Sequence, residues 1–164
     1  MVLYHGTTNT YEIGQIVVKD SGPSHAISPV DQAFDSQRDP RLGLRQNALY
    51  AAANAAWATA YIQAECTFNG RPASEIHIYK VRMSPFHVGP MAIVDFVRKA
   101  LNAGEPTDAL VREYWSPKEP RWHFLEYLGT EFLVLEEVDQ VDLTFRAESY
   151  QYGVDRDRLK RLAA

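Results

Sequence analysis

The segment Val2-Leu3-Tyr4-His5-Gly6-Thr7-Thr8 lies at the start of the chain, and the fold prediction depends on it. Its apolar run, 2–4, predicts a first β-strand, which Gly6 ends. His5 and Gly6 therefore come at the carboxyl end of that strand. The His5 imidazole can form hydrogen bonds, and a ligand can approach the Gly6 main chain closely because glycine has no side chain. This pair therefore suits a ligand-binding position.

Further apolar runs predict the rest of a sheet, and helical patterns lie between them. The predicted strands after the first are 16–18, 48–52, 76–81, 131–138 and 141–146. Asn54 is placed to cap an alanine-rich helix that ends near Cys66, and helices are also expected over 93–102 and 108–114. The polar stretch 19–47, with its Gly and Pro residues, is predicted to be mostly loop.

Strands and helices follow one another without regular alternation, and no glycine-rich dinucleotide fingerprint is present. This order predicts an α+β fold with small, mainly antiparallel sheets. We expect one domain over 1–147 and a C-terminal tail over 148–164, either frayed or a short docked helix.

The composition limits the class of protein. The chain has 164 residues, 46% hydrophobic and 23% charged, which is typical of one globular domain. Cys66 has no partner for an internal disulfide, so we expect a buried thiol and a cytoplasmic protein. No apolar run is long enough to span a membrane. The net charge of −4 argues against a broad nucleic-acid-binding surface.

Three short islands of sequence carry a resemblance to a known family. They are Tyr4-His5-Gly6-Thr7-Thr8, the pair Tyr50 and Tyr61, and an acidic residue at Glu126 or Glu131. In this order they resemble the ADP-ribosyltransferase superfamily, in the His-Tyr-Glu branch shared by poly(ADP-ribose) polymerases and small bacterial rifampin-modifying transferases. The resemblance implies split antiparallel β-sheets with flanking helices, and NAD as co-substrate without a metal.

The resemblance also implies roles for particular residues. His5, Gly6 and Thr7 are expected to bind NAD, and Tyr50 and Tyr61 to stack on its nicotinamide ring. In addition, Arg38, Arg41 and Arg45 form a basic cluster in the polar stretch. Because guanidinium groups bind phosphate through a planar fork of donors, Arg41 or Arg45 is a candidate for the pyrophosphate.

The resemblance predicts Glu126 as the catalytic carboxylate, with Glu131 as the alternative. One alignment places Glu126 at the start of a strand as the catalytic residue, and another places Glu131 there. Glu113 and Asp95 are the remaining candidates. A carboxylate is needed because cleavage of nicotinamide from NAD passes through a sugar cation.

We therefore predict an NAD-dependent ADP-ribosyltransferase that transfers a single ADP-ribose unit. Its acceptor, which is a protein, a nucleic acid or a small molecule, is left open. The alternatives are an NAD glycohydrolase with the same site and a non-catalytic module that senses NAD or docks a partner. A 2′-phosphotransferase acting on RNA is less suited to this acidic chain. The small size suggests a bacterial or phage effector by analogy.

Overall fold

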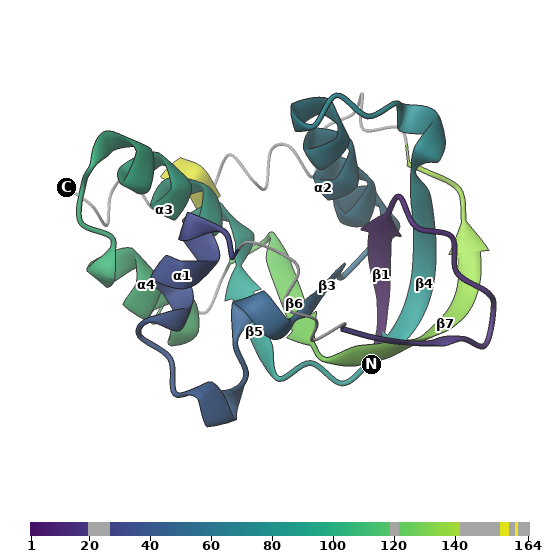
Figure 1. Cartoon of the computed structure of the whole chain (residues 1–164), viewed down its shortest axis with the longest axis horizontal. Helices are drawn as coiled ribbons and strands as arrows, with labels where there is room; N and C mark the ends of the chain where they lie inside the picture. Colours follow the sequence, from purple (N-terminus) through teal and green to yellow (C-terminus); the bar gives the residue numbers. More distant parts are fainter. Residues whose placement is uncertain (20–26, 119–121, 142–154, 158–159, 161–164) are drawn as a thin grey trace.

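The protein is described by a computed structural model that covers residues 1–19, 27–118, 122–141, 155–157 and 160. The strands of these residues form one antiparallel sheet in the order β2-β7-β4-β1-β3-β6-β5 (Figure 1). Their bounds are β1 (Val2–Thr7), β2 (Ile16–Val18), β3 (Leu49–Ala52), β4 (His77–Met83), β5 (His87–Pro90), β6 (Leu125–Gly129) and β7 (Glu131–Val138). The predicted α+β class is confirmed.

The sheet is almost divided between β1 and β3. β1 pairs with β4 along its whole length, from Val2 opposite Arg82 to Thr7 opposite His77. In contrast, β1 meets β3 at one pair alone, Tyr4 with Ala52. The resemblance predicts split sheets, but the structure has one continuous sheet, because this single pair joins the two parts.

Helices cover the two parts of the sheet separately (Figure 1). They are α1 (Pro29–Asp35), α2 (Ala55–Phe68), α3 (Met91–Ala103) and α4 (Asp108–Trp115). α2 lies against β1, whereas α1, α3 and α4 gather at the β5 end. The predicted cap of α2 is confirmed, since the Asn54 side chain accepts a hydrogen bond from the Trp57 N–H at 2.9 Å.

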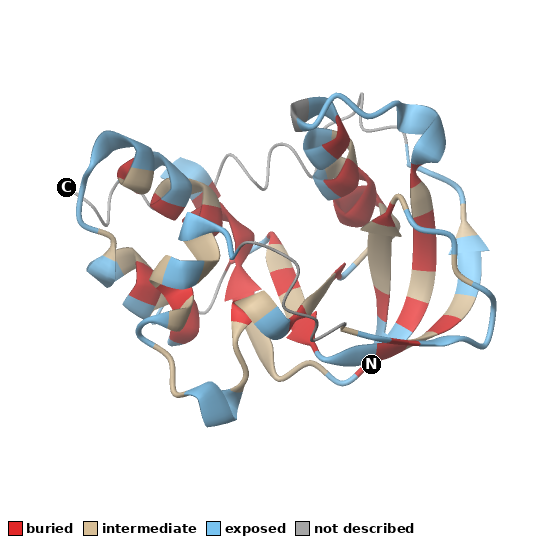
Figure 2. Ribbon diagram, viewed as in Figure 1, coloured by how far each residue is buried: buried red, intermediate tan, exposed pale blue. Residues whose placement is uncertain are grey.

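Buried apolar side chains form two clusters on the two faces of the sheet. Figure 2 shows where the buried residues lie along the strands and helices. The larger cluster packs the helices against the sheet and includes Trp57, Ile62 and Cys66, so the predicted burial of the thiol is confirmed. The smaller cluster includes Leu3, Tyr79 and Phe132. Both clusters draw on alternate residues of the same strands, as the pleat of a sheet requires.

Three parts of the structure differ from the predicted elements. β6 is not among the strands predicted from apolar runs. The stretch 19–47 contains α1 and the 3-10 turns Pro40–Leu42 and Arg45–Asn47, and a third such turn lies at Ala73–Glu75. Ser28 caps α1 by accepting from the Asp31 N–H at 3.0 Å, and Pro29 lies in the first turn. These residues form a helix start inside the stretch predicted to be loop. β5 was missed because Gly89-Pro90 has the composition of a turn.

The predicted strand 141–146 and most of the predicted tail 148–164 lie outside the described residues. Asp155 is described and fully buried. Its carboxylate accepts hydrogen bonds from the N–H groups of His123 and Phe124 at 2.9 and 3.0 Å, directly before β6. Among the residues described, no helix combines the length and apolar character needed to cross a bilayer.

Candidate functional site

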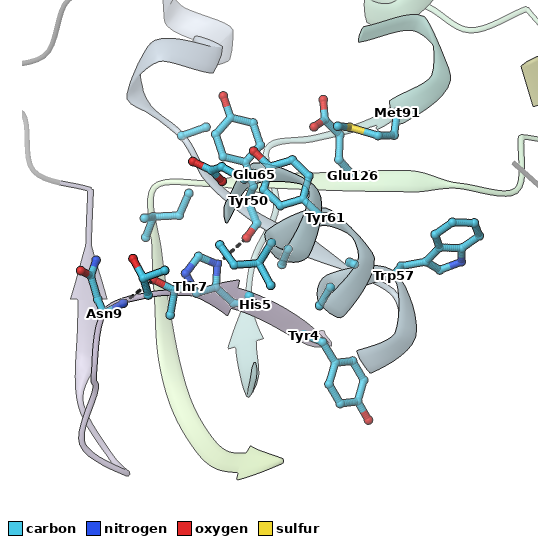
Figure 3. Close-up of a pocket in the computed structure, with 18 of the residues that line it drawn as sticks. Tyr4, His5, Thr7, Asn9, Tyr50, Trp57, Tyr61, Glu65, Met91 and Glu126 are labelled. Carbon is cyan, nitrogen blue, oxygen red and sulfur yellow. Dashed lines mark hydrogen bonds between the residues drawn. The ribbon is translucent and has the colours of Figure 1, made fainter. Parts of the chain in front are cut away.

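A cavity of about 520 Å³ opens where β1 and β3 diverge (Figure 3). β1, β3, α2 and the start of β6 supply most of its wall. Six residues predicted from the sequence line this cavity: His5, Gly6, Thr7, Tyr50, Tyr61 and Glu126. The divided sheet therefore brings together groups that are far apart along the chain.

The His5 ring is held in one orientation by β3. Its Nδ1 lies 2.7 Å from the Tyr50 carbonyl oxygen. Because a carbonyl can only accept, Nδ1 carries the proton and Nε2 is left as an acceptor. Burial lowers the pKa of His5, and the bond to Tyr50 only partly opposes this effect, so the ring is neutral at pH 7. A neutral Nε2 can accept a hydrogen bond from a ligand hydroxyl.

The main-chain groups of Gly6 face the gap between β1 and β3. The amino terminus of Met1 donates to the Met83 carbonyl at 2.6 Å, and the Met83 N–H donates back at 3.0 Å. In an antiparallel pair, residues that exchange two hydrogen bonds with their partner alternate with residues whose N–H and C=O point away from the partner strand. In this register the Gly6 groups point away from β4. Since β3 pairs with β1 at Tyr4 alone, no described strand forms hydrogen bonds with the Gly6 N–H and C=O groups.

Gly6 is also required by the packing of α2. A Cβ atom at this position would lie 2.6 Å from the Ala58 carbonyl oxygen and 2.9 Å from Cγ2 of Ile62. Both contacts are too short for any side chain. The missing Cβ lets α2 approach β1 closely.

Glu126 is 5% exposed and is fixed from one side. Its Oε1 accepts hydrogen bonds from Nη1 of Arg45 and from the Tyr114 hydroxyl, the second at 2.5 Å. Arg45, itself 5% exposed, also bonds Asp31 through Nε at 3.0 Å. No described residue bonds Oε2 of Glu126. One carboxylate oxygen is thus anchored, and the other remains for a ligand.

The two predicted tyrosines reach the cavity from different elements (Figure 3). Tyr50 extends from β3, and its hydroxyl donates to the Arg45 carbonyl at 2.8 Å. Tyr61 extends from α2 and is 36% exposed. Trp57 lines the same cavity but stacks on Phe124 at a centroid distance of 3.8 Å, which makes it part of the core.

The other predicted site residues lie elsewhere. Arg41 is exposed and pairs with Asp39 at 2.5 Å, and neither Arg41 nor Arg45 lines the cavity. Glu131 is exposed at the start of β7, opposite Val18 of the edge strand β2. The remaining acidic candidates, Glu113 and Asp95, are also outside the cavity wall.

Three charged residues that sequence reasoning missed line the cavity: Lys19, Glu65 and Arg71. Arg71 donates from Nη1 to the Thr8 hydroxyl at 2.7 Å, beside the first island of sequence. No motif surrounds any of the three. Only the folded chain brings them to the cavity.

No protein-family model matches the chain, and a search of the curated proteins found no match. Within the described part of the chain, no group of three or more His, Cys, Asp or Glu side chains is placed to hold a metal ion.

We expect the free energy of unfolding to fall as the pH is lowered from about 6.5 towards 4. Burial lowers the pKa of His5, and burial followed by the Arg38 charge lowers the pKa of His87 to about 4. Each imidazole gains its proton more readily in the unfolded chain, so acid favours unfolding. Urea titrations between pH 7.5 and 4.5 measure this slope. His87→Gln should reduce it, and an unchanged slope would contradict the assignment for His87.

Proposed function

We propose that the protein cleaves the bond between nicotinamide and ribose in NAD and transfers the ADP-ribose unit to an acceptor. The observation that supports this most strongly is the meeting of a neutral imidazole, unpaired main-chain groups, two tyrosines and a half-anchored carboxylate in one cavity. The near division of the sheet at this cavity also supports an ADP-ribosyltransferase-like arrangement.

In this proposal, the Gly6 main chain binds the carboxamide of nicotinamide. An amide presents one acceptor and two donor hydrogens, which match an N–H and a C=O group that face the same gap. Tyr50 and Tyr61 hold the ring from β3 and α2. Aromatic contacts contribute about 0.5–1.5 kcal/mol per pair beyond burial, enough to orient the ring. The Nε2 of His5 accepts from a ribose hydroxyl.

Glu126 stabilises the sugar cation. When the bond from C1′ to the pyridinium nitrogen breaks, its electron pair goes to the ring and nicotinamide leaves as a neutral molecule. Oε2 accepts a hydrogen bond from the ribose 2′-hydroxyl, so the negative charge lies next to the forming cation. Arg45 and Tyr114 keep the carboxylate in place through Oε1, which reduces the reorganisation that the reaction requires.

The test is the release of nicotinamide from NAD by the purified protein, followed by chromatography. Release together with label retained on an acceptor supports the transferase. Release with stoichiometric free ADP-ribose instead assigns a glycohydrolase, in which water takes the acceptor's place. NAD binding without release of nicotinamide would indicate a binding module and contradict the proposed reaction.

The positive charges at the cavity are suited to the pyrophosphate of NAD. Arg71→Gln is expected to weaken NAD binding by about tenfold, because a charge-assisted hydrogen bond contributes about 1.5–3 kcal/mol and solvent screens part of it. Inhibition by free nicotinamide, which has no phosphate, should stay unchanged. Calorimetry measures the first effect and a competition assay the second. Arg41→Gln is the matched control, and equal losses in both variants would contradict this role of Arg71.

A further inference from the structure

A second carboxylate, Glu65, lies at the cavity one helical turn after Tyr61 (Figure 3). Residues four apart on a helix share a face, so Glu65 and Tyr61 project to the same side of α2. The carboxylate is therefore close to the ring that we place beside nicotinamide.

Glu65 and Glu126 differ in what surrounds them. Glu126 is buried and anchored by Arg45 and Tyr114, whose bonds fix its position. Glu65 is exposed, and no described residue forms an ion pair or hydrogen bond with its carboxylate. An anchored acid suits charge stabilisation, whereas a free and accessible one suits exchange of a proton with an incoming molecule.

Glu65 also lines a second cavity that borders the first. This cavity, of about 400 Å³, is lined in part by Cys66 and Asn69. It shares Thr8, Ile62, Glu65 and Arg71 with the first cavity. A molecule bound in the second cavity would thus contact Glu65, which also lines the cavity that we propose for the ribose.

We propose that Glu65 is the general base of the transfer, the group that takes the proton from the acceptor that enters through this second cavity. The proposal rests on the proposed function. In the step, an acceptor O–H oxygen forms a bond to C1′ while the bond to nicotinamide breaks, with its electron pair passing to the ring. The O–H proton moves to the Glu65 carboxylate, and water is the acceptor when no other is present.

Azide ion provides the test, since it is a nucleophile without a proton to lose. With NAD and water alone, Glu65→Ala is expected to lower the kcat of nicotinamide release by about 10²-fold, the effect of losing a general base, and to leave KM nearly unchanged. Added sodium azide should restore the rate and yield ADP-ribosyl azide. The control Glu75→Ala removes an exposed carboxylate outside both cavities and should behave like the wild type.

The outcomes distinguish the role of Glu65 from the proposed function on which it rests. A wild-type rate in Glu65→Ala overturns the role of Glu65 and leaves the reaction itself standing. A slow variant that keeps its circular dichroism spectrum but is not restored by azide also overturns it. If the wild-type protein releases no nicotinamide, both proposals fail together.

Discussion

Glu126→Gln is expected to lower the rate of nicotinamide release by about 10²–10³-fold, comparable to the loss of one preorganised electrostatic group. The amide has the shape of the carboxylate and can still accept from Arg45, so the fold should be kept. It lacks the negative charge that opposes the sugar cation. Nicotinamide release at saturating NAD measures the effect, and NAD affinity should change much less than kcat.

Glu131→Gln is the matched control for this variant. Glu131 is exposed at the start of β7 and does not line the cavity, so its activity should equal that of the wild type. Loss of activity in Glu131→Gln with retention in Glu126→Gln would reverse the assignment of the catalytic carboxylate.

Arg45→Met is expected to reduce the free energy of unfolding by about 3–5 kcal/mol, because it leaves the buried Glu126 charge without its partner. The double variant Arg45→Met/Glu126→Leu should recover much of this loss, since no buried charge is then left unpaired. Asp31, the other partner of Arg45, is partly exposed and can be hydrated. Urea unfolding of the three proteins measures both differences.

Arg41→Met serves as the control, because the Arg41–Asp39 pair is on the surface, and this variant should be as stable as the wild type. An Arg45→Met protein as stable as this control would show that the buried ion pair does not hold β6 to the 3-10 turn Arg45–Asn47. The proposal that Arg45 keeps the Glu126 carboxylate in place would then be wrong.

Local signals in the sequence predicted most of the elements. The run 2–4 gave β1, and Asn54 gave the start of α2, because strand alternation and helix capping depend on near neighbours. β5 was not predictable in this way. Its Gly89 and Pro90 resemble a turn, but Gly89 is needed because a Cβ at this position would overlap the Tyr114 ring. That requirement arises only from a contact distant in sequence.

The same limit applies to the site. His5, Gly6, Tyr50, Tyr61 and Glu126 were chosen by resemblance, and all of them line one cavity. Arg45 is a phosphate-ligand candidate by its charge, but its guanidinium bonds the carboxylates of Asp31 and Glu126. Pairings of this kind depend on how a loop packs against a strand, and the spacing of residues along the chain does not carry that information.

A crystal structure of the Glu126→Gln variant with NAD tests the proposed site as a whole. We expect nicotinamide between Tyr50 and Tyr61, its carboxamide bonded to the Gly6 main chain, and the ribose 2′-hydroxyl within hydrogen-bonding distance of the residue 126 side chain. NAD bound outside this cavity, or with its nicotinamide turned away from Gly6, would contradict the proposed function.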